Sequence, residues 1–184
     1  DGVLPLQVFE VRYLDMMRKC IDNGSPFGVV LLTHGSEVRT PDGDEQFEQC
    51  GTLATVQETL EASPGLLKVM CRGAARFRIV SSERRPNGLW MAEVELLEND
   101  HAVPIPSELQ GAADALDRVL ESLGDIPEDR WPLLPPFQLD DCGWVSNRWC
   151  DLLPLPAAQK QMLLTLDNPL IRLELLHDML DEHG

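Results

Sequence analysis

Cysteine thiols can bind metal, exchange disulfides or act as nucleophiles, depending on their spacing and neighbours. In this sequence they are odd in number and widely spaced, and no C-x-x-C pair suggests zinc binding or redox exchange. A nucleophilic cysteine also needs a base within hydrogen-bond reach, and no motif supplies one. We interpret the thiols as reduced and mostly buried, and keep a thiol-dependent enzyme as an alternative function. They are Cys20, Cys50, Cys71, Cys142 and Cys150.

Nucleotide and metal chemistry find no support in the sequence. No stretch fits the phosphate-binding patterns G-x-x-x-x-G-K-[ST] or G-x-G-x-x-G. The four histidines are scattered, without H-E-x-x-H or another ligand spacing. We therefore predict no cofactor, no metal and no enzymatic activity.

A short cluster of arginines interrupts an otherwise acidic sequence. Arg76 and Arg78 alternate with Phe77 and Ile79, so the two arginines lie on one face of a predicted strand. The cluster, Arg72, Arg76, Arg78, Arg84 and Arg85, could hold a carboxylate or phosphate, or pair with Glu93 and Glu95 across a sheet. We favour internal pairing.

Residues 131–137 combine three prolines with four large apolar side chains. The prolines prevent a regular helix, so the segment is predicted to be an apolar loop that either packs internally or faces a partner. We favour packing, and predict a binding groove where this loop and the arginine-rich strand border each other. The candidate binding residues are Arg72, Arg76, Arg78, Trp131, Leu133, Leu134 and Phe137.

Charge limits the classes of partner. The formal net charge is −16, with 43% hydrophobic and 25% charged residues, which is typical of an ordered globular protein. Residues 1–103 carry 10 Lys/Arg against 16 Asp/Glu, and residues 104–184 carry 5 against 15. Such a surface repels nucleic acid and anionic membrane. With no run of about 18 apolar residues, we expect no membrane association and a cytoplasmic location.

The first half of the sequence is predicted to be rich in β-strand. Short apolar or alternating segments separated by turn residues occur at 27–32, 51–60, 66–71, 75–81 and 89–97. One helix is predicted near residues 9–22, where Phe9, Tyr13 and Met16 recur at helical spacing before a stop at Gly24. This number of short strands suggests a closed or partly open barrel covered by the helix.

The second half is predicted to be helical. His101 to Pro106 contains two prolines, so we place the domain boundary there and divide the chain into residues 1–103 and 104–184. Ser107 and Gln110 fit a capping box at the start of a helix that ends near Gly124. Further helices are predicted at 140–153, 156–166 and 169–180. The predicted fold class is α+β.

Four motifs in a fixed order resemble the N-terminal domain of the Lon protease family. Leu4 to Tyr13 is similar to the family pattern PL-x-[IV]-F-E-x-R-Y, and Phe27 to Leu32 follows at a fitting interval. Gly51-Thr52-Leu53-Ala54 and Gly73-Ala74-Ala75-Arg76-Phe77-Arg78-Ile79 are similar to G-T-x-A and G-x-x-R-F-R-I. The tail, from Lys160 through Arg172 to Leu176, resembles the family's terminal pair of helices.

The resemblance implies a PUA-like β-barrel subdomain followed by a helical subdomain, with the family's first strand lying before Asp1. It implies recognition of unfolded or tagged polypeptides without ATPase or protease domains, together with a protease or chaperone partner. The matching residues are read as a fold signature, with Phe9 and Tyr13 facing the core. Glu10 and Arg12 are either contact residues of the family or an ion pair that ties the helix to the barrel. The matching residues are Pro5, Phe9, Glu10, Arg12, Tyr13, Gly51, Thr52, Gly73, Arg76 and Phe77.

Three functions remain open at this point. The first is a non-catalytic polypeptide-binding module in proteostasis, and the second is an RNA-binding PUA-like protein. The third is the thiol-dependent enzyme named above. The acidic surface favours the first, because an RNA-binding protein usually carries a broad basic face.

Overall fold

The computed structural model describes residues 1–36, 45–123 and 131–183. Its contacts divide the chain into two compact units, one made of Asp1 and Val3–Asn99 and the other of Gly2 and Asp100–Gly184. We call them the sheet unit and the helical unit and describe each by itself. The boundary that the sequence suggested, between residues 103 and 104, stays a prediction.

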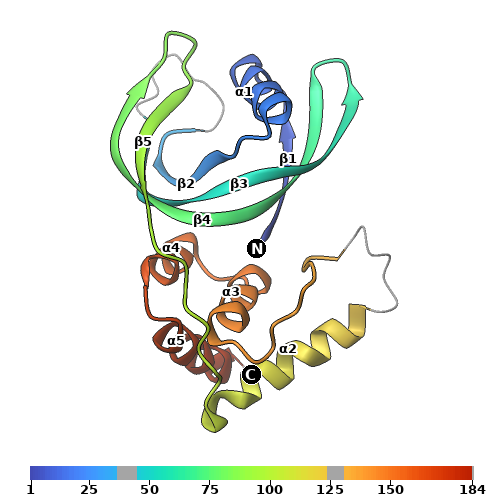
Figure 1. Cartoon of the computed structure of the whole chain (residues 1–184), viewed down its shortest axis with the longest axis vertical. Helices are drawn as coiled ribbons and strands as arrows, with labels where there is room; N and C mark the ends of the chain where they lie inside the picture. Colours follow the sequence, from blue (N-terminus) through green and yellow to red (C-terminus); the bar gives the residue numbers. More distant parts are fainter. Residues whose placement is uncertain (37–44, 124–130, 184) are drawn as a thin grey trace. The chain divides into compact units, whose positions relative to one another are not determined.

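The sheet unit is built on one antiparallel sheet of five strands (Figure 1). Its strands are β1 (Val3–Val8), β2 (Phe27–His34), β3 (Gln46–Ser63), β4 (Leu66–Arg84) and β5 (Trp90–Leu96). The long strand β4 pairs with β3 on one side. On its other side it pairs first with β1, at Leu67 to Arg72, and then with β5, at Phe77 to Arg84.

The sheet is curved but not closed, which corrects the closed-barrel alternative. The strand path runs β1-β4-β3-β2, and in the part of the chain described no pairing links β2 back to β1 or β5. The curvature has a local cause, because the β3–β4 ladder shifts register after Thr52, Val56 and Glu61. Each such irregularity bends a strand and increases its twist. The predicted α+β class is confirmed.

Two strand predictions need correction. The segments 66–71 and 75–81 are one continuous strand, because Gly73 pairs with Ala54 and the small residues around it do not interrupt the ladder. Strand β1 was not among the predicted strands. Pro5 lies opposite Met70 in β1, which among the described residues pairs with β4 alone, and at such an edge a missing N–H is tolerated.

Helix α1 (Val11–Asn23) packs against the sheet through one face. Leu14, Met17 and Cys20 are buried at helical spacing and share a core with Val8 and Phe27. The helix ends at Gly24, whose φ of 61° is favourable only without a side chain, and the Gly24 N–H donates to the Cys20 and Ile21 carbonyls. The helix prediction was right, but Phe9 does not face the core: it is 56% exposed.

In its described residues, the helical unit contains a short 3-10 turn, η1 (Ser107–Leu109), and four helices (Figure 1). The helices are α2 (Gln110–Ser122), α3 (Cys142–Leu152), α4 (Ala157–Thr165) and α5 (Pro169–His183). Most of α3 is buried, and its Trp144, Val145 and Trp149 form the centre of the core. The predicted capping box is absent, because the Ser107 hydroxyl donates to Glu108 and caps no amide.

A buried arginine links the helices of this unit. Arg172 on α5 is 2% exposed, and its guanidinium donates to both carboxylate oxygens of Asp100, at 2.6 and 3.2 Å. It also donates to the carbonyl oxygen of Leu163 and to the side chain of Asn147. A charge buried this deeply is tolerated only when it is paired and its donors are satisfied, so Arg172 has a structural role.

Candidate functional site

The first sequence motif forms a buried ion-pair cluster in the sheet unit. Arg12 is 5% exposed, and its Nε donates to Glu10 Oε2 at 3.0 Å. Its Nη1 donates to the carbonyl oxygen of Gly88 at 2.7 Å and lies 3.9 Å from Glu45 Oε1. The guanidinium carbon also lies 4.6 Å from the centre of the Tyr13 ring, as in a cation–π contact. Arg12 therefore connects the start of α1 to the β4–β5 turn.

Glu45 is the centre of the same cluster. Its side chain is 7% exposed and accepts hydrogen bonds from Trp90 Nε1 at 3.1 Å and Arg84 Nη2 at 3.3 Å. Phe47 packs edge-on against Trp90, with ring centres 5.2 Å apart. Two arginines thus neutralise one buried carboxylate, and its neighbours shield it from water. The cluster holds its charges in fixed pairs, which suits a structural tie between α1 and the sheet.

The motif that contains Gly51 has a steric explanation. A Cβ atom on Gly51 would lie 2.4 Å from the Val29 carbonyl oxygen and 2.7 Å from the Phe77 ring. Phe77 is 2% exposed and lies opposite Gly51 in the β3–β4 ladder. Thr52 lies opposite Arg76 in the same ladder. These motif residues therefore maintain close packing between β2, β3 and β4.

The arginine cluster is largely paired within the sheet unit, but mostly not with the predicted partners. Arg84 binds Glu45, Arg85 binds Glu83 at 3.0 Å, and Arg72 binds Asp1 at 3.1 Å. Arg76 Nη2 donates to the carbonyl oxygen of Glu98 at 3.4 Å. Arg78 lies opposite Glu95 in the β4–β5 ladder, and Glu93 accepts from Ser81 instead. Whether Arg72, Arg76 or Arg78 contacts a ligand stays a prediction.

The apolar loop of residues 131–137 belongs to the helical unit. Leu133 is 1% exposed and is part of its core. Trp131 and Leu134 are half-buried, while Phe137 is 37% exposed. The Phe137 ring lies 6.4 Å from Trp131 and 6.0 Å from Trp144. Internal packing thus accounts for Leu133, and Phe137 retains a surface that a ligand could contact. The groove that would join this loop to the arginines stays a prediction.

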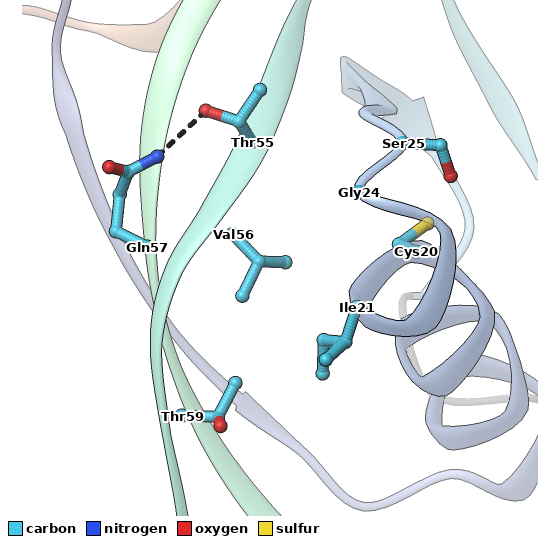
Figure 2. Close-up of a pocket in the computed structure, with 8 residues that line it drawn as sticks. All are labelled: Cys20, Ile21, Gly24, Ser25, Thr55, Val56, Gln57 and Thr59. Atoms are coloured by element: carbon cyan, nitrogen blue, oxygen red, sulfur yellow. Dashed lines mark hydrogen bonds between the residues drawn. The ribbon is translucent and has the colours of Figure 1, made fainter.

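A small hollow lies between the end of α1 and β3 (Figure 2). Its volume is about 180 Å³, below the roughly 300–1,000 Å³ of typical small-molecule sites. Gln57 donates to Thr55 Oγ1 at 3.0 Å across part of its lining. The lining residues are Cys20, Ile21, Gly24, Ser25, Thr55, Val56, Gln57 and Thr59. Neither its size nor its side chains indicate catalysis.

Three of the cysteines do not have the environment of a nucleophile. Burial raises the pKa of Cys71 and of Cys142, and raises the pKa of Cys150 to about 11. A reactive cysteine instead needs a lowered pKa, since the thiolate is the attacking form. These three thiols are therefore protonated at neutral pH. Over residues 1–36, 45–123 and 131–183, no group of three His, Cys, Asp or Glu side chains is placed to hold a metal ion.

The comparison that decides the family covers nearly the whole chain. The profile described as the ATP-dependent protease La (LON) substrate-binding domain matches residues 1–182. This chain belongs to that family. Because the match leaves only two of the 184 residues unassigned, both units are parts of one Lon substrate-binding domain.

Similar proteins are consistent with this assignment. Lon protease 2 of Desulfotalea psychrophila is 27% identical over 154 residues, which cover 83% of this chain and 20% of that protein. The chain therefore spans about a fifth of the length of this relative. A crystal structure of a Lon N-terminal domain protein from Xanthomonas campestris is 34% identical, with a TM-score of 0.73, over 95% of this chain and 88% of that one.

A more distant structure shares the fold. The N-terminal domain of a Mycobacterium avium complex Lon protease is 19% identical over 100% of this chain and 92% of that chain, with a TM-score of 0.58. In the described residues of this Lon substrate-binding domain, no helix is both long and apolar enough to cross a membrane.

Sequence reasoning missed one surface of the domain. Val94 and Leu96 alternate with Glu93 and Glu95 in β5, which is the pattern of a half-buried strand, yet they are 38% and 59% exposed. Alternation shows that two faces differ, but it does not show whether anything covers the apolar face. The absence of lysine and proline from residues 90–96 is a signal that could have indicated an unprotected edge.

Proposed function

We propose that this Lon substrate-binding domain binds segments of unfolded or tagged polypeptides and has no catalytic activity of its own. The observation that carries the proposal is the family match over residues 1–182 combined with exposed large apolar side chains in the sheet unit. Such side chains offer favourable contacts to the apolar residues that an unfolded chain exposes. They are Phe9, Val11, Ile21, Leu60, Val80, Met91, Val94 and Leu96.

The two alternative functions have less support. RNA binding would require a basic surface, whereas the net charge is −16 and Arg84, Arg85 and Arg72 are each paired with a carboxylate. A thiol-dependent enzyme would require an activated cysteine, and burial raises the pKa of Cys71, Cys142 and Cys150. RNA binding therefore serves as the alternative outcome in the binding experiment.

The partners follow from the same proposal. A relative of this chain is a Lon protease, so we propose that polypeptides bound here are passed to a protease or held together with a chaperone. A cytoplasmic location fits five cysteines of which none forms a disulfide, because disulfides are favoured in oxidising compartments. No cofactor takes part in this function.

Binding to an unfolded protein and to RNA can be compared at two salt concentrations. We expect a reduced and carbamidomethylated model protein to bind with a dissociation constant on the order of micromolar, since a flexible ligand loses conformational entropy on binding. Apolar contacts should weaken little with added salt, whereas RNA affinity falls steeply as counterions return. Fluorescence anisotropy measures both. Tighter binding of single-stranded RNA, lost in salt, would contradict the proposal.

The part played by the apolar loop can be measured with two double variants of the helical unit. We predict that Trp131→Ala with Phe137→Ala weakens polypeptide binding several-fold, because two large apolar contacts are removed. The control is Met162→Ala with Ile171→Ala, since both of those side chains are 44% exposed and lie outside the loop. Equal affinities for the two double variants would rule out the loop as a contact and leave the other candidate residues to be tested.

A further inference from the structure

The exposed edge of β5 has an unusual combination of features. Strand β5 pairs with β4 on one side, and among the described residues no strand pairs with its other side. Natural edge strands are usually protected by lysine, proline or a bulge that keeps other chains from pairing with them. Strand β5 contains neither lysine nor proline, and the register shift in this ladder, between Ile79 and Ser81, is on β4.

The register shows which backbone groups face the open side. The Leu97 N–H donates to the Arg76 carbonyl oxygen at 2.9 Å, so the backbone of Leu97 faces β4. Alternate residues of an antiparallel strand face the same neighbour, and no register shift separates Leu97 from Val94. The N–H and C=O groups of Val94 and Leu96 therefore point away from β4.

The same two residues present exposed apolar side chains. Val94 lies opposite Ile79 and Leu96 lies opposite Phe77, so their side chains are on the sheet face that carries Phe77. Leu96 is 59% exposed although this face is buried at Phe77. An added strand that hydrogen-bonds to Val94 and Leu96 would place its own side chains beside them. Apolar side chains at those positions would extend the apolar face.

The opposite face of β5 is acidic. Glu93 and Glu95 alternate with Val94 and Leu96, and both glutamates are exposed. A residue located between the two apolar positions of an added strand would lie beside Glu95, where a cationic side chain is favoured. Two copies of β5 pairing with each other would instead bring glutamates together. Charge therefore selects a foreign basic strand over a second copy of this chain.

We propose that the free edge of β5 binds an extended polypeptide segment of alternating apolar and basic residues, which adds to the sheet as a further strand. This inference rests on the proposed polypeptide-binding function and names the class of segment and the residues that hold it. Main-chain hydrogen bonds to Val94 and Leu96 supply affinity, and Glu93 and Glu95 select the basic side chains.

The test uses a fluorescent peptide of alternating lysine and valine or leucine, titrated against the full chain. Methylating the amides of its apolar residues removes the N–H groups that would bond to β5, and we expect about a tenfold or greater loss of affinity. Methylating the same number of lysine amides is the control, because those N–H groups face away from β5. Equal loss with both peptides would overturn the strand-addition geometry.

Two variants of the chain locate the site. We expect Leu96→Lys to weaken peptide binding by about tenfold, since it places a cation beside the apolar positions of the peptide and adds repulsion to its lysines. The control, Met162→Lys, adds the same charge to an exposed apolar residue of the helical unit, which is 44% exposed against 59% for Leu96. Equal weakening by both would show a general charge effect and overturn the inference. So would concentration-dependent dimers of the chain that Leu96→Lys abolishes.

The unfolded model protein separates this inference from the broader function. If the wild-type chain and Leu96→Lys bind the unfolded protein equally well, the β5 edge is not the site and polypeptide binding stands. If the wild-type chain binds neither the unfolded protein nor the peptide, both proposals fail. Weaker binding of both ligands by Leu96→Lys, with binding by Met162→Lys unchanged, supports the edge of β5 as the site.

Discussion

At the scale of single residues, each unit contains an arginine that is buried with its counter-charge and with a main-chain acceptor. Arg12 pairs with Glu10 and donates to the Gly88 carbonyl. Arg172 pairs with Asp100 and donates to the Leu163 carbonyl. Removing one member of such a pair leaves a buried charge without compensation, which costs more free energy than the pair contributes. Their positions in the sequence motifs are thus explained by folding alone.

Close packing around Gly51 in the sheet unit can be tested by a substitution. We predict that Gly51→Ala lowers the free energy of unfolding by about 1–3 kcal/mol, because the added methyl group overlaps the Val29 carbonyl and the side chains of Val30 and Phe77. Chemical denaturation followed by circular dichroism measures the change.

The matched control is Gly111→Ala on α2, where an added Cβ meets no atom within 4 Å. That substitution should leave stability unchanged or raise it by about 0.5–1 kcal/mol, because alanine favours the helix. If Gly51→Ala were as stable as Gly111→Ala, the close approach around Gly51 would not be the reason for the glycine.

At the scale of elements, periodicity predicted most helices and strands. It failed where the assignment depends on which strands pair with each other. Alternation located β5 and helical spacing located α1, because one face of each had to be apolar. Strand β1 was not among the predicted strands, and its Pro5 is compatible with a strand because β1 lies at an edge of the described sheet. A single sequence does not give pairing partners, so the continuous β4 was read as two strands.

The candidate binding residues were less predictable than the elements. An ion pair between Glu10 and Arg12 was one of two alternatives that the sequence left open, and the structure contains that pair at the start of α1. The contribution of Glu45 was not foreseen, because it comes from a different part of the chain. The exposure of Leu96 was not foreseen either, since a strand's alternation does not reveal which of its edges is free.

Asp141 determines where α3 begins. Its Oδ2 accepts from the Trp144 N–H at 2.8 Å, and its Oδ1 accepts from the Val103 N–H at 2.8 Å. We predict that Asp141→Ala lowers the free energy of unfolding by about 1–2 kcal/mol, because the helix start loses its cap and Val103 loses an acceptor. Thermal denaturation detects the loss. The exposed neighbour provides the control: Asp140→Ala should have little effect, and an equal loss would show a general charge effect instead.

At the scale of the whole molecule, buried thiols limit stability in alkaline solution. Burial, with a smaller contribution from Asp151, raises the pKa of Cys150 from 9.0 to about 11 in the folded protein. Burial also raises the pKa of Cys71 and of Cys142, so both units contain such a group. The unfolded chain therefore loses these protons at a lower pH than the folded chain does.

The free energy of unfolding therefore decreases with pH over the range in which only the unfolded chain has lost these protons. The stabilisation is complete below about pH 9 and is lost as the pH rises through the folded-state pKa values, at up to about 1.4 kcal/mol per pH unit for each thiol. We predict that the free energy of unfolding falls between about pH 9 and 11 and that Cys150→Ala makes the fall less steep. Urea denaturation at several pH values measures both slopes. An unchanged slope in Cys150→Ala would mean that this thiol does not contribute.

The two strands that flank β4 on one side lie end to end. Strand β1 begins at Val3, opposite Arg72, and β5 ends at Leu96, opposite Phe77. Both are antiparallel to β4, so they run in the same direction, and the end of β5 points toward the start of β1. The start of β1 and the end of β5 therefore both lie beside the middle of β4. A short linker from β5 to β1 would preserve every strand pairing among the described residues, as a circular permutation of the sheet unit requires.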